Sequence, residues 1–232
     1  PKGIALLTFP SLLTAVIKLG MRKVLVQEMY SVETLARVDT LCLDKTGTIT
    51  QGKMTVEALH SLSDHFSEET IKVILSAYMQ YSEDTNPTAQ AIRKAYGELE
   101  HAYTAENIIP FSSDRKWGAM HLSNLGTVFL GAPEMLLKEN PAPVVEAQAR
   151  GSRGLVLAHS SELISMQELK LPENLEGIAV IEITDPIREG ASDTLEYLRS
   201  QGVDLKIISG DNPVTVSYIC LLYTSDAADD LL

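Results

Sequence analysis

A carboxylate follows a short apolar run early in the chain, in the string Leu41-Cys42-Leu43-Asp44. The run predicts a strand buried on both faces, with Asp44 where its carboxyl end opens into a loop. Ligands bind at that edge of open parallel sheets. The loop residues add a positive charge, two hydroxyls and a glycine that lets main-chain N–H groups approach an anion; they are Lys45, Thr46, Gly47 and Thr48. Such a loop suits a carboxylate that attacks a phosphoryl group and forms an acyl phosphate.

The string Asp44-Lys45-Thr46-Gly47-Thr48 resembles the phosphorylation signature of the P-type ATPases, ion pumps that pass through an aspartyl-phosphate. A lone aspartate after an apolar run is usually an ordinary strand-to-turn residue, but five such residues together are specific. The resemblance implies catalytic roles for Asp44, Lys45 and Thr46. It also implies that ATP is the substrate, that Thr48 contacts it, and that Asp44 and the main-chain carbonyl of Thr46 hold Mg²⁺.

The catalytic core of those pumps is a haloacid-dehalogenase-like domain. Soluble phosphatases of that superfamily usually carry a second aspartate two positions after the nucleophile, as general acid and base. This chain has Thr46 there, which cannot shuttle a proton at neutral pH. A pump is therefore favoured. Two alternatives stay open: a soluble haloacid-dehalogenase-type phosphatase with a large cap, and a nucleotide-binding module without catalysis.

The composition limits the partners. The chain has 232 residues, 45% of them hydrophobic and 22% charged, which indicates a folded protein of one large domain or two modest ones. A net charge of −12 argues against a nucleic-acid partner. ATP is also an anion, so it needs a local positive patch or Mg²⁺. Cys42 and Cys220 make no disulfide framework, and Cys42 is expected to be a small core residue in a reducing compartment.

Residues 1–23 begin nearly uncharged and end in a basic cluster, as is typical of the cytoplasmic side of a membrane helix. Taken alone, they could also form a buried amphipathic helix. Pro1-Lys2-Gly3-Ile4 resembles the unwound element of the fourth membrane helix of P-type pumps. We therefore expect the C-terminal part of a transmembrane helix and its stalk. The resemblance favours bacterial calcium-type and related cation pumps, which are multi-pass proteins of the cell membrane, with this region mostly cytoplasmic. Lys2 stands where such pumps often carry an ion-binding Glu, which leaves the ion open, calcium included.

The chain is predicted to be an α/β protein, an internal fragment of such a pump. Residues 24–52 would form the first part of a phosphorylation domain with a Rossmann-type parallel sheet, and residues 53–177 an inserted α+β nucleotide-binding domain. Residues 178–219 would return to the phosphorylation domain. Residues 220–232 resemble the translation of a sequencing-library adapter, with a natural acidic tail as the alternative.

The inserted region has clear local signals. Ser67 begins a helix with capping-box chemistry, and Asn86 caps a second helix that runs to Tyr96. Four strands and two further helices are expected, the strands at Glu106–Phe111, Trp117–Leu122, Thr127–Leu130 and Leu155–Ala158, and the helices at Glu134–Leu137 and Val144–Arg150.

Three segments of this region resemble the nucleotide site of the pumps. Phe111-Ser112-Ser113-Asp114-Arg115-Lys116 resembles the adenine motif, which implies that Phe111 stacks on the base and Lys116 lies near the phosphates. Gly131 lies in a turn that resembles a Lys-Gly-Ala-Pro-Glu motif, with Leu130 in place of the lysine. Arg153 matches an arginine that reaches toward the phosphates. Ala89 replaces a frequent Glu near the adenine, so the affinity for ATP should be reduced.

Gly177 to Pro186 returns to a buried strand that ends in Asp185, which resembles the hinge where the pump chain re-enters its phosphorylation domain. A helix from Arg188 to Gln201 and a parallel strand from Val203 to Ile208 should follow. Next comes a loop that resembles a Thr-Gly-Asp-Asn motif and could hold phosphate oxygens opposite Asp44. Its candidate ligands are Ser209, Gly210 and Asp211.

Overall fold

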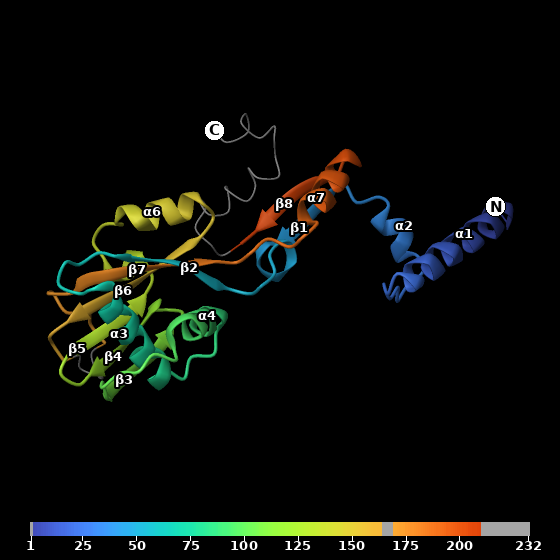
Figure 1. The fold of residues 1–232 in the computed structure, drawn as a ribbon. Coiled ribbons are helices and arrows are strands. Elements are labelled where there is room, and N and C mark those ends of the chain that lie inside the picture. Colours follow the sequence, from blue (N-terminus) through green and yellow to red (C-terminus); the bar gives the residue numbers. More distant parts are fainter. Residues whose placement is uncertain (1, 164–168, 210–232) are drawn as a thin grey trace. The chain divides into compact units, whose positions relative to one another are not determined.

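The structure is a computed structural model that describes residues 2–163 and 169–209 (Figure 1). Contacts divide the chain into two units. The first comprises Pro1–Leu43 and Asp193–Lys206, and the second comprises Asp44–Ser192 and Ile207–Leu232. The predicted loop residues Gly210 and Asp211, and the segment 220–232, lie outside the described residues.

The first unit begins with the helices α1 (Lys2–Met21) and α2 (Ser31–Leu35), followed by strand β1 (Thr40–Asp44), whose last residue already belongs to the second unit. Helix α7 (Ala191–Ser200) leads into strand β8 (Asp204–Ile208), and β8 pairs with β1 in a two-stranded sheet. The N–H of Asp204 donates to the carbonyl of Asp39, 2.7 Å away, where both strands begin. The two strands therefore run in the same direction, and their carboxyl ends lie at the same edge.

Strand β1 differs from its prediction in burial. Leu41 and Leu43 are half-buried and Cys42 is exposed. A strand buried on both faces needs neighbouring strands and covering helices. Among the described residues β1 has one neighbouring strand, β8, so the expectation that Cys42 is a core residue is wrong.

We expected residues 1–23 to contain the end of a transmembrane helix, and the chain does form α1 there. Crossing a bilayer takes about 20 mostly apolar residues. Within residues 2–163 and 169–209, none of the helices is long and apolar enough to do so.

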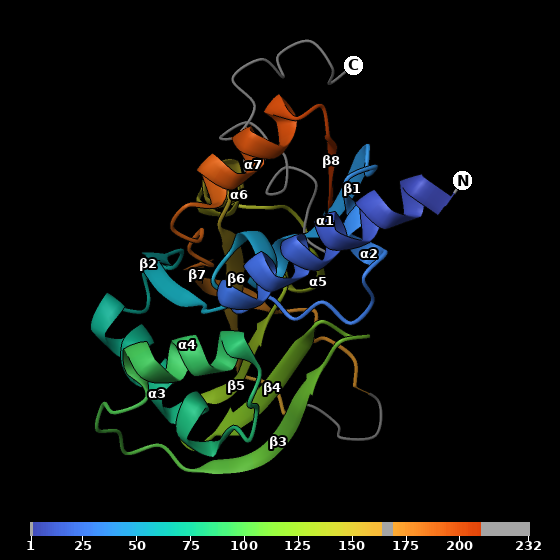
Figure 2. The ribbon, with the colours of Figure 1, turned by 90° about the vertical axis from the view of Figure 1, so that its right-hand side faces the viewer.

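The second unit is built on a six-stranded sheet with the order β2-β7-β6-β5-β4-β3, in which every neighbouring pair is antiparallel. Its strands are β2 (Thr55–Ser61), β3 (Ala105–Ser112), β4 (Trp117–Leu122), β5 (Gly126–Gly131), β6 (Arg153–Ser160) and β7 (Glu176–Thr184). Its helices are α3 (Glu68–Tyr81), α4 (Pro87–Tyr96), α5 (Pro133–Leu136) and α6 (Ala142–Ala149). Helices α3 and α4 cover one face of the sheet and α6 covers the other (Figures 1 and 2).

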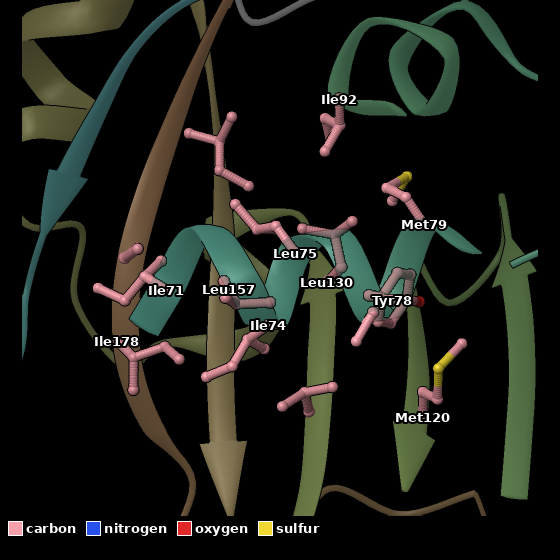
Figure 3. Close-up of a cluster of buried hydrophobic side chains, with 14 of the residues drawn as sticks. Ile71, Ile74, Leu75, Tyr78, Met79, Ile92, Met120, Leu130, Leu157 and Ile178 are labelled. Atoms are coloured by element: carbon pink, nitrogen blue, oxygen red, sulfur yellow. The ribbon is translucent and has the colours of Figure 1, made fainter. Parts of the chain in front are cut away.

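Alternate residues along the strands pack in two separate hydrophobic cores, one on each face of the sheet. On β5, Val128 and Leu130 pack in the core under α3 and α4, whereas Phe129 between them packs in the core that contains Val144 of α6. Figure 3 shows the first core, where Leu75 and Tyr78 of α3 face Leu130 of the sheet. A sheet covered on both faces explains why nearly every residue of β4 and β5 is buried, instead of buried and exposed residues alternating.

The predicted helix starts are confirmed. Ser67 accepts a hydrogen bond from the N–H of Thr70 at the start of α3, and Asn86 accepts one from the N–H of Ala89 at the start of α4. The four predicted strands of this region each lie within one of the strands β3 to β6. Strand β2 was not predicted.

Two elements lie elsewhere than expected. Residues 178–184, expected in the phosphorylation domain, belong to β7, which pairs antiparallel with β2 and β6 inside the six-stranded sheet. The helix predicted from Arg188 begins only at Ala191, because Ile187 forms a bridge with Thr50 and is held extended.

Candidate functional site

Asp44 is the last residue of β1, and its side chain is exposed. The chain then makes one wide turn, Lys45–Ile49, which the N–H of Thr50 closes by donating to the carbonyl of Lys45, 3.1 Å away. Within this turn Gly47 has a φ of 77°, a conformation that favours glycine. We call residues 44–50 the aspartate loop. Lys45 is buried in it, whereas Thr46 and Thr48 are exposed.

A second segment, residues 185–188, holds the aspartate loop in place. The carboxylate of Asp185 accepts hydrogen bonds from the hydroxyl of Thr50, 2.6 Å away, and from the N–H of Gly52, 2.9 Å away. The guanidinium of Arg188 donates to the carbonyls of Gly47 and Thr50, at 2.6 and 2.9 Å. We call residues 185–188 the hinge segment. Asp185 therefore connects the segment that leaves the aspartate loop to the segment that follows β7, and its role as a hinge stays a prediction.

Ser209 follows directly after β8, and Asp44 ends β1. Because these strands are parallel neighbours, both residues lie at the carboxyl edge of the two-stranded sheet. Ser209 is half-buried. The predicted partners Gly210 and Asp211 are outside the described residues.

A pocket of about 500 Å³ opens on the α3–α4 side of the six-stranded sheet. It brings together three of the predicted nucleotide ligands, which come from three different strands: Phe111 at the end of β3, Gly131 at the end of β5, and Arg153 at the start of β6. Phe111 is 40% exposed, so part of its ring is open to a ligand. Thr46 of the aspartate loop also lines the pocket.

The two positions that depart from the nucleotide-site motifs of the pumps both line this pocket. Ala89 lines it from the first turn of α4, and Leu130 lines it from β5. Both side chains are buried and apolar. The pocket wall is therefore apolar at two positions where the corresponding pump motifs carry a charged residue.

Lys116 is placed differently from the other predicted ligands. It occupies a turn with a φ of 57°, and its Nζ lies 3.0 Å from a carboxylate oxygen of Glu134. Both side chains are 55% exposed. Within the described residues, the lining of the pocket does not include Lys116. An exposed ion pair of this kind contributes about 1 kcal/mol or less, so it leaves the lysine free to exchange partners.

Two polar residues of the pocket were not predicted from the sequence. Tyr78 of α3 and Asp84 of the following loop both line it. Burial raises the pKa of the Tyr78 phenol above its usual value, and the nearby charge of Asp84 raises it further. Arg93 fixes the loop by donating to the carbonyls of Ser82 and Asp84, at 2.9 and 3.1 Å. The sequence signal was weak, because Tyr78 has the spacing of a core residue.

The donors for a metal ion are few in the described part of the chain. No group of three or more His, Cys, Asp or Glu residues comes together there. The aspartate loop offers the exposed carboxylate of Asp44 and the main-chain carbonyl of Thr46. Mg²⁺ is often held by one or two carboxylates while waters and substrate phosphates fill the remaining positions, so this donor set fits it.

Comparisons with known proteins agree with this architecture. Residues 38–230 match a family model described as a haloacid dehalogenase-like hydrolase. The chain is 66% identical over 220 residues to the probable cation-transporting ATPase exp7 of Streptococcus pneumoniae serotype 4, covering 94% of this chain. It is 34% identical over 222 residues to the calcium-transporting ATPase CtpE of Mycobacterium tuberculosis, again over 94% of this chain. The chain spans 28% of the length of each of these relatives.

A solved structure gives the same result for the fold. A zinc-transporting PIB-type ATPase in its E2.Pi state superposes with a TM-score of 0.59 and 24% sequence identity. The match covers 86% of this chain and 30% of that protein. The family model covers most of the chain, and the curated relatives over the same region are cation-transporting ATPases. This chain belongs to the haloacid dehalogenase-like hydrolase family.

Proposed function

We propose that this chain supplies the phosphoryl-accepting loop and the ATP-binding site of a P-type cation-transporting ATPase of a cell membrane. The observation that carries the proposal is the pocket on the six-stranded sheet, where Phe111, Gly131 and Arg153 converge and Thr46 of the aspartate loop contributes to the lining. A phosphatase would need no base-binding pocket, and a nucleotide-binding module would need no aspartate loop.

ATP would lie with its adenine against the exposed part of the Phe111 ring, an interaction that aromatic faces provide for any base. Gly131 would contribute its main chain to the pocket wall, since a Cβ there would collide with the backbone of Lys116 and Trp117. Arg153 would donate to the phosphate oxygens, where a guanidinium can form paired hydrogen bonds. Lys116 would leave Glu134 and add a second positive charge on the phosphate side.

The chemical step would then take place at Asp44. One carboxylate oxygen attacks the γ-phosphorus, the bond to the β,γ-bridging oxygen breaks, ADP leaves, and the phosphoryl group stays on Asp44. The ammonium group of Lys45, the hydroxyls of Thr48 and Ser209, and main-chain N–H groups of Gly210 and Asp211 would donate hydrogen bonds to the phosphoryl oxygens. Mg²⁺ held by Asp44 and the carbonyl of Thr46 would neutralise negative charge on the phosphates. Thr46 provides no acid–base group, so the acyl phosphate should persist long enough to drive a conformational change.

The transported ion is proposed to be a divalent cation, with calcium as the first to test. The names of the relatives and of the solved structure include calcium and zinc, so the pump core alone does not select between them. Lys2 remains the residue at which this chain departs from the expected ion ligand.

Nucleotide binding can be tested on the 232-residue chain by titration with ATP, followed by calorimetry or by amide NMR shifts. We expect a dissociation constant of roughly 0.1 to several mM, with Ala89 and Leu130 as the reason for the weak affinity. Phe111→Ala should weaken binding several-fold. Phe9→Ala, which removes an exposed ring in α1, is the matched control and should leave binding unchanged. Absence of binding at about 10 mM ATP would refute the nucleotide site.

A further inference from the structure

A single acidic residue interrupts the buried run of β7. Glu182 is 3% exposed, and its neighbours along the strand, Ile181 and Ile183, are buried and apolar. A buried carboxylate costs several kcal/mol unless other groups pair with it and donate hydrogen bonds to it. The pumps' phosphoryl chemistry, as proposed above, gives Glu182 no role, so its presence needs another explanation.

The side chain of Glu182 lies on the face of the sheet opposite the pocket. Side chains alternate along a strand, so Glu182 shares its face with Val180, which packs in the core with Val144 of α6. Ile183 points the other way and lines the pocket. Figure 1 shows α6 lying over this part of the sheet, close to β7.

Three side chains converge on the Glu182 carboxylate. The guanidinium of Arg150 donates to it at 2.8 Å, the ring of His60 on β2 lies 3.3 Å away, and Ser152 also hydrogen-bonds to it. Burial alone would raise the pKa of Glu182, but these hydrogen bonds outweigh burial and hold the pKa below its usual value. The carboxylate is therefore charged and fully engaged at neutral pH.

Two of these partners belong to the turn that leads into the pocket. Arg150 and Ser152 flank Gly151, whose φ is 77°, in the turn between α6 and β6. The next residue is Arg153, which pairs with Ile183 across the sheet and lines the pocket. Glu182 thus holds two of the three residues that precede Arg153, the arginine that lines the pocket.

We propose that Glu182 is a positioning residue for Arg153. Glu182 fixes the turn 150–152 from the face of the sheet opposite the pocket. In this way it determines the position of the Arg153 guanidinium in the pocket, and so the geometry of the hydrogen bonds that Arg153 can donate to a phosphate group. The inference rests on the proposed function for the identity of the ligand, ATP. The position of Arg153 itself can be followed without any ligand.

The test compares ATP with adenosine, which lacks the phosphates, on the 232-residue chain. Glu182→Gln should weaken ATP binding about three- to tenfold, because the neutral amide holds Arg150 less tightly. Adenosine binding should change less than about twofold. Glu176→Gln makes the same change at the exposed start of the same strand and should affect neither ligand. In an Arg153→Ala background, Glu182→Gln should have no further effect on ATP binding.

A readout without ligand separates this inference from the proposed function. The side-chain Nε–H resonance of Arg153 should shift in Glu182→Gln and stay unchanged in Glu176→Gln. If Glu182→Gln does not fold, Arg150→Gln removes the same contact from the exposed side and should give the same pattern. Three results would each overturn the proposal. Glu182→Gln could weaken ATP and adenosine binding equally, its effect on ATP affinity could add to that of Arg153→Ala, or the Arg153 Nε–H resonance could stay where it is in the wild-type chain. Failure of the wild-type chain to bind ATP, with the Arg153 shift present, would instead count against the nucleotide site alone.

Discussion

The carboxylate of Asp185 and the hydroxyl of Thr50 lie 2.6 Å apart although 135 positions separate them in the sequence. The same carboxylate accepts the N–H of Gly52. This pair joins the chain as it leaves the aspartate loop to the chain as it returns from the six-stranded sheet. The contact therefore ties the end of the aspartate loop to the segment that follows β7.

Removing this carboxylate should loosen the junction locally. In Asp185→Ala, the N–H of Gly52 and the hydroxyl of Thr50 lose a charged acceptor, a loss of about 1.5–3 kcal/mol for each hydrogen bond. We expect hydrogen exchange at the Gly52 amide to accelerate about 10- to 100-fold, measured by NMR. Asp64→Ala, at an exposed position of the same unit, should leave it unchanged. Unchanged exchange in Asp185→Ala would mean that the contact does not hold the hinge.

Because of the buried phenol of Tyr78, the free energy of unfolding of the second unit should decrease at alkaline pH. Its pKa is raised in the folded state, so above the usual tyrosine pKa of about 10 the unfolded chain loses a proton that the folded chain keeps. The contribution of Tyr78 to the free energy of unfolding is fully present below about pH 10. It falls as pH rises above about 10, by at most about 1.4 kcal/mol per pH unit. Urea unfolding followed by the fluorescence of the buried Trp117 should show this slope.

The slope should become shallower in Tyr78→Phe, with a remainder from Tyr96, whose pKa burial also raises. It should stay unchanged in Tyr30→Phe, because Tyr30 is 71% exposed. An unchanged alkaline slope in Tyr78→Phe would show that another group is responsible.

Restoring the missing lysine should strengthen nucleotide binding. In Leu130→Lys, an ammonium group in the pocket wall can meet the nucleotide phosphates, and we expect ATP to bind about fivefold more tightly while adenosine does not. Leu130→Met keeps the volume without the charge and should leave both affinities nearly unchanged. A gain for adenosine as large as that for ATP would place the new group away from the phosphates.

Local signals predicted much of the second unit. Ser67 and Asn86 cap α3 and α4 as expected, since a side-chain cap depends only on residues three positions apart. Strand β2 was missed for a physical reason: its register with β7 shifts between Val56 and Ala58, which breaks the alternation of polar and apolar residues that would have marked it.

Long-range features were less predictable. Leu41 to Leu43 looks like a central strand, but burial depends on neighbours that the string itself does not contain, and Cys42 is exposed. The antiparallel pairing of β7 is set by β2, more than a hundred residues away.

The site was predicted in part. Motif resemblance named Phe111, Gly131 and Arg153, which share one pocket, but it could not foresee the ion pair of Lys116 with Glu134. The roles of these residues, and of Thr48 and Ser209, remain predictions. The polar residues found only in the structure, Tyr78 and Asp84, lie within core-like or loop-like sequence that carries no motif.

The central claim is that Asp44 accepts a phosphoryl group from ATP, and labelling tests it most directly. The complete transporter that contains this segment is incubated with γ-labelled ATP and Mg²⁺, quenched in acid, and analysed for covalent label. We expect acid-stable, hydroxylamine-sensitive label on the peptide that contains Asp44. Asp44→Asn should abolish it, because an amide is a poor nucleophile. Asp39→Asn, the same change just before β1, should retain it. Label that survives Asp44→Asn would contradict the account.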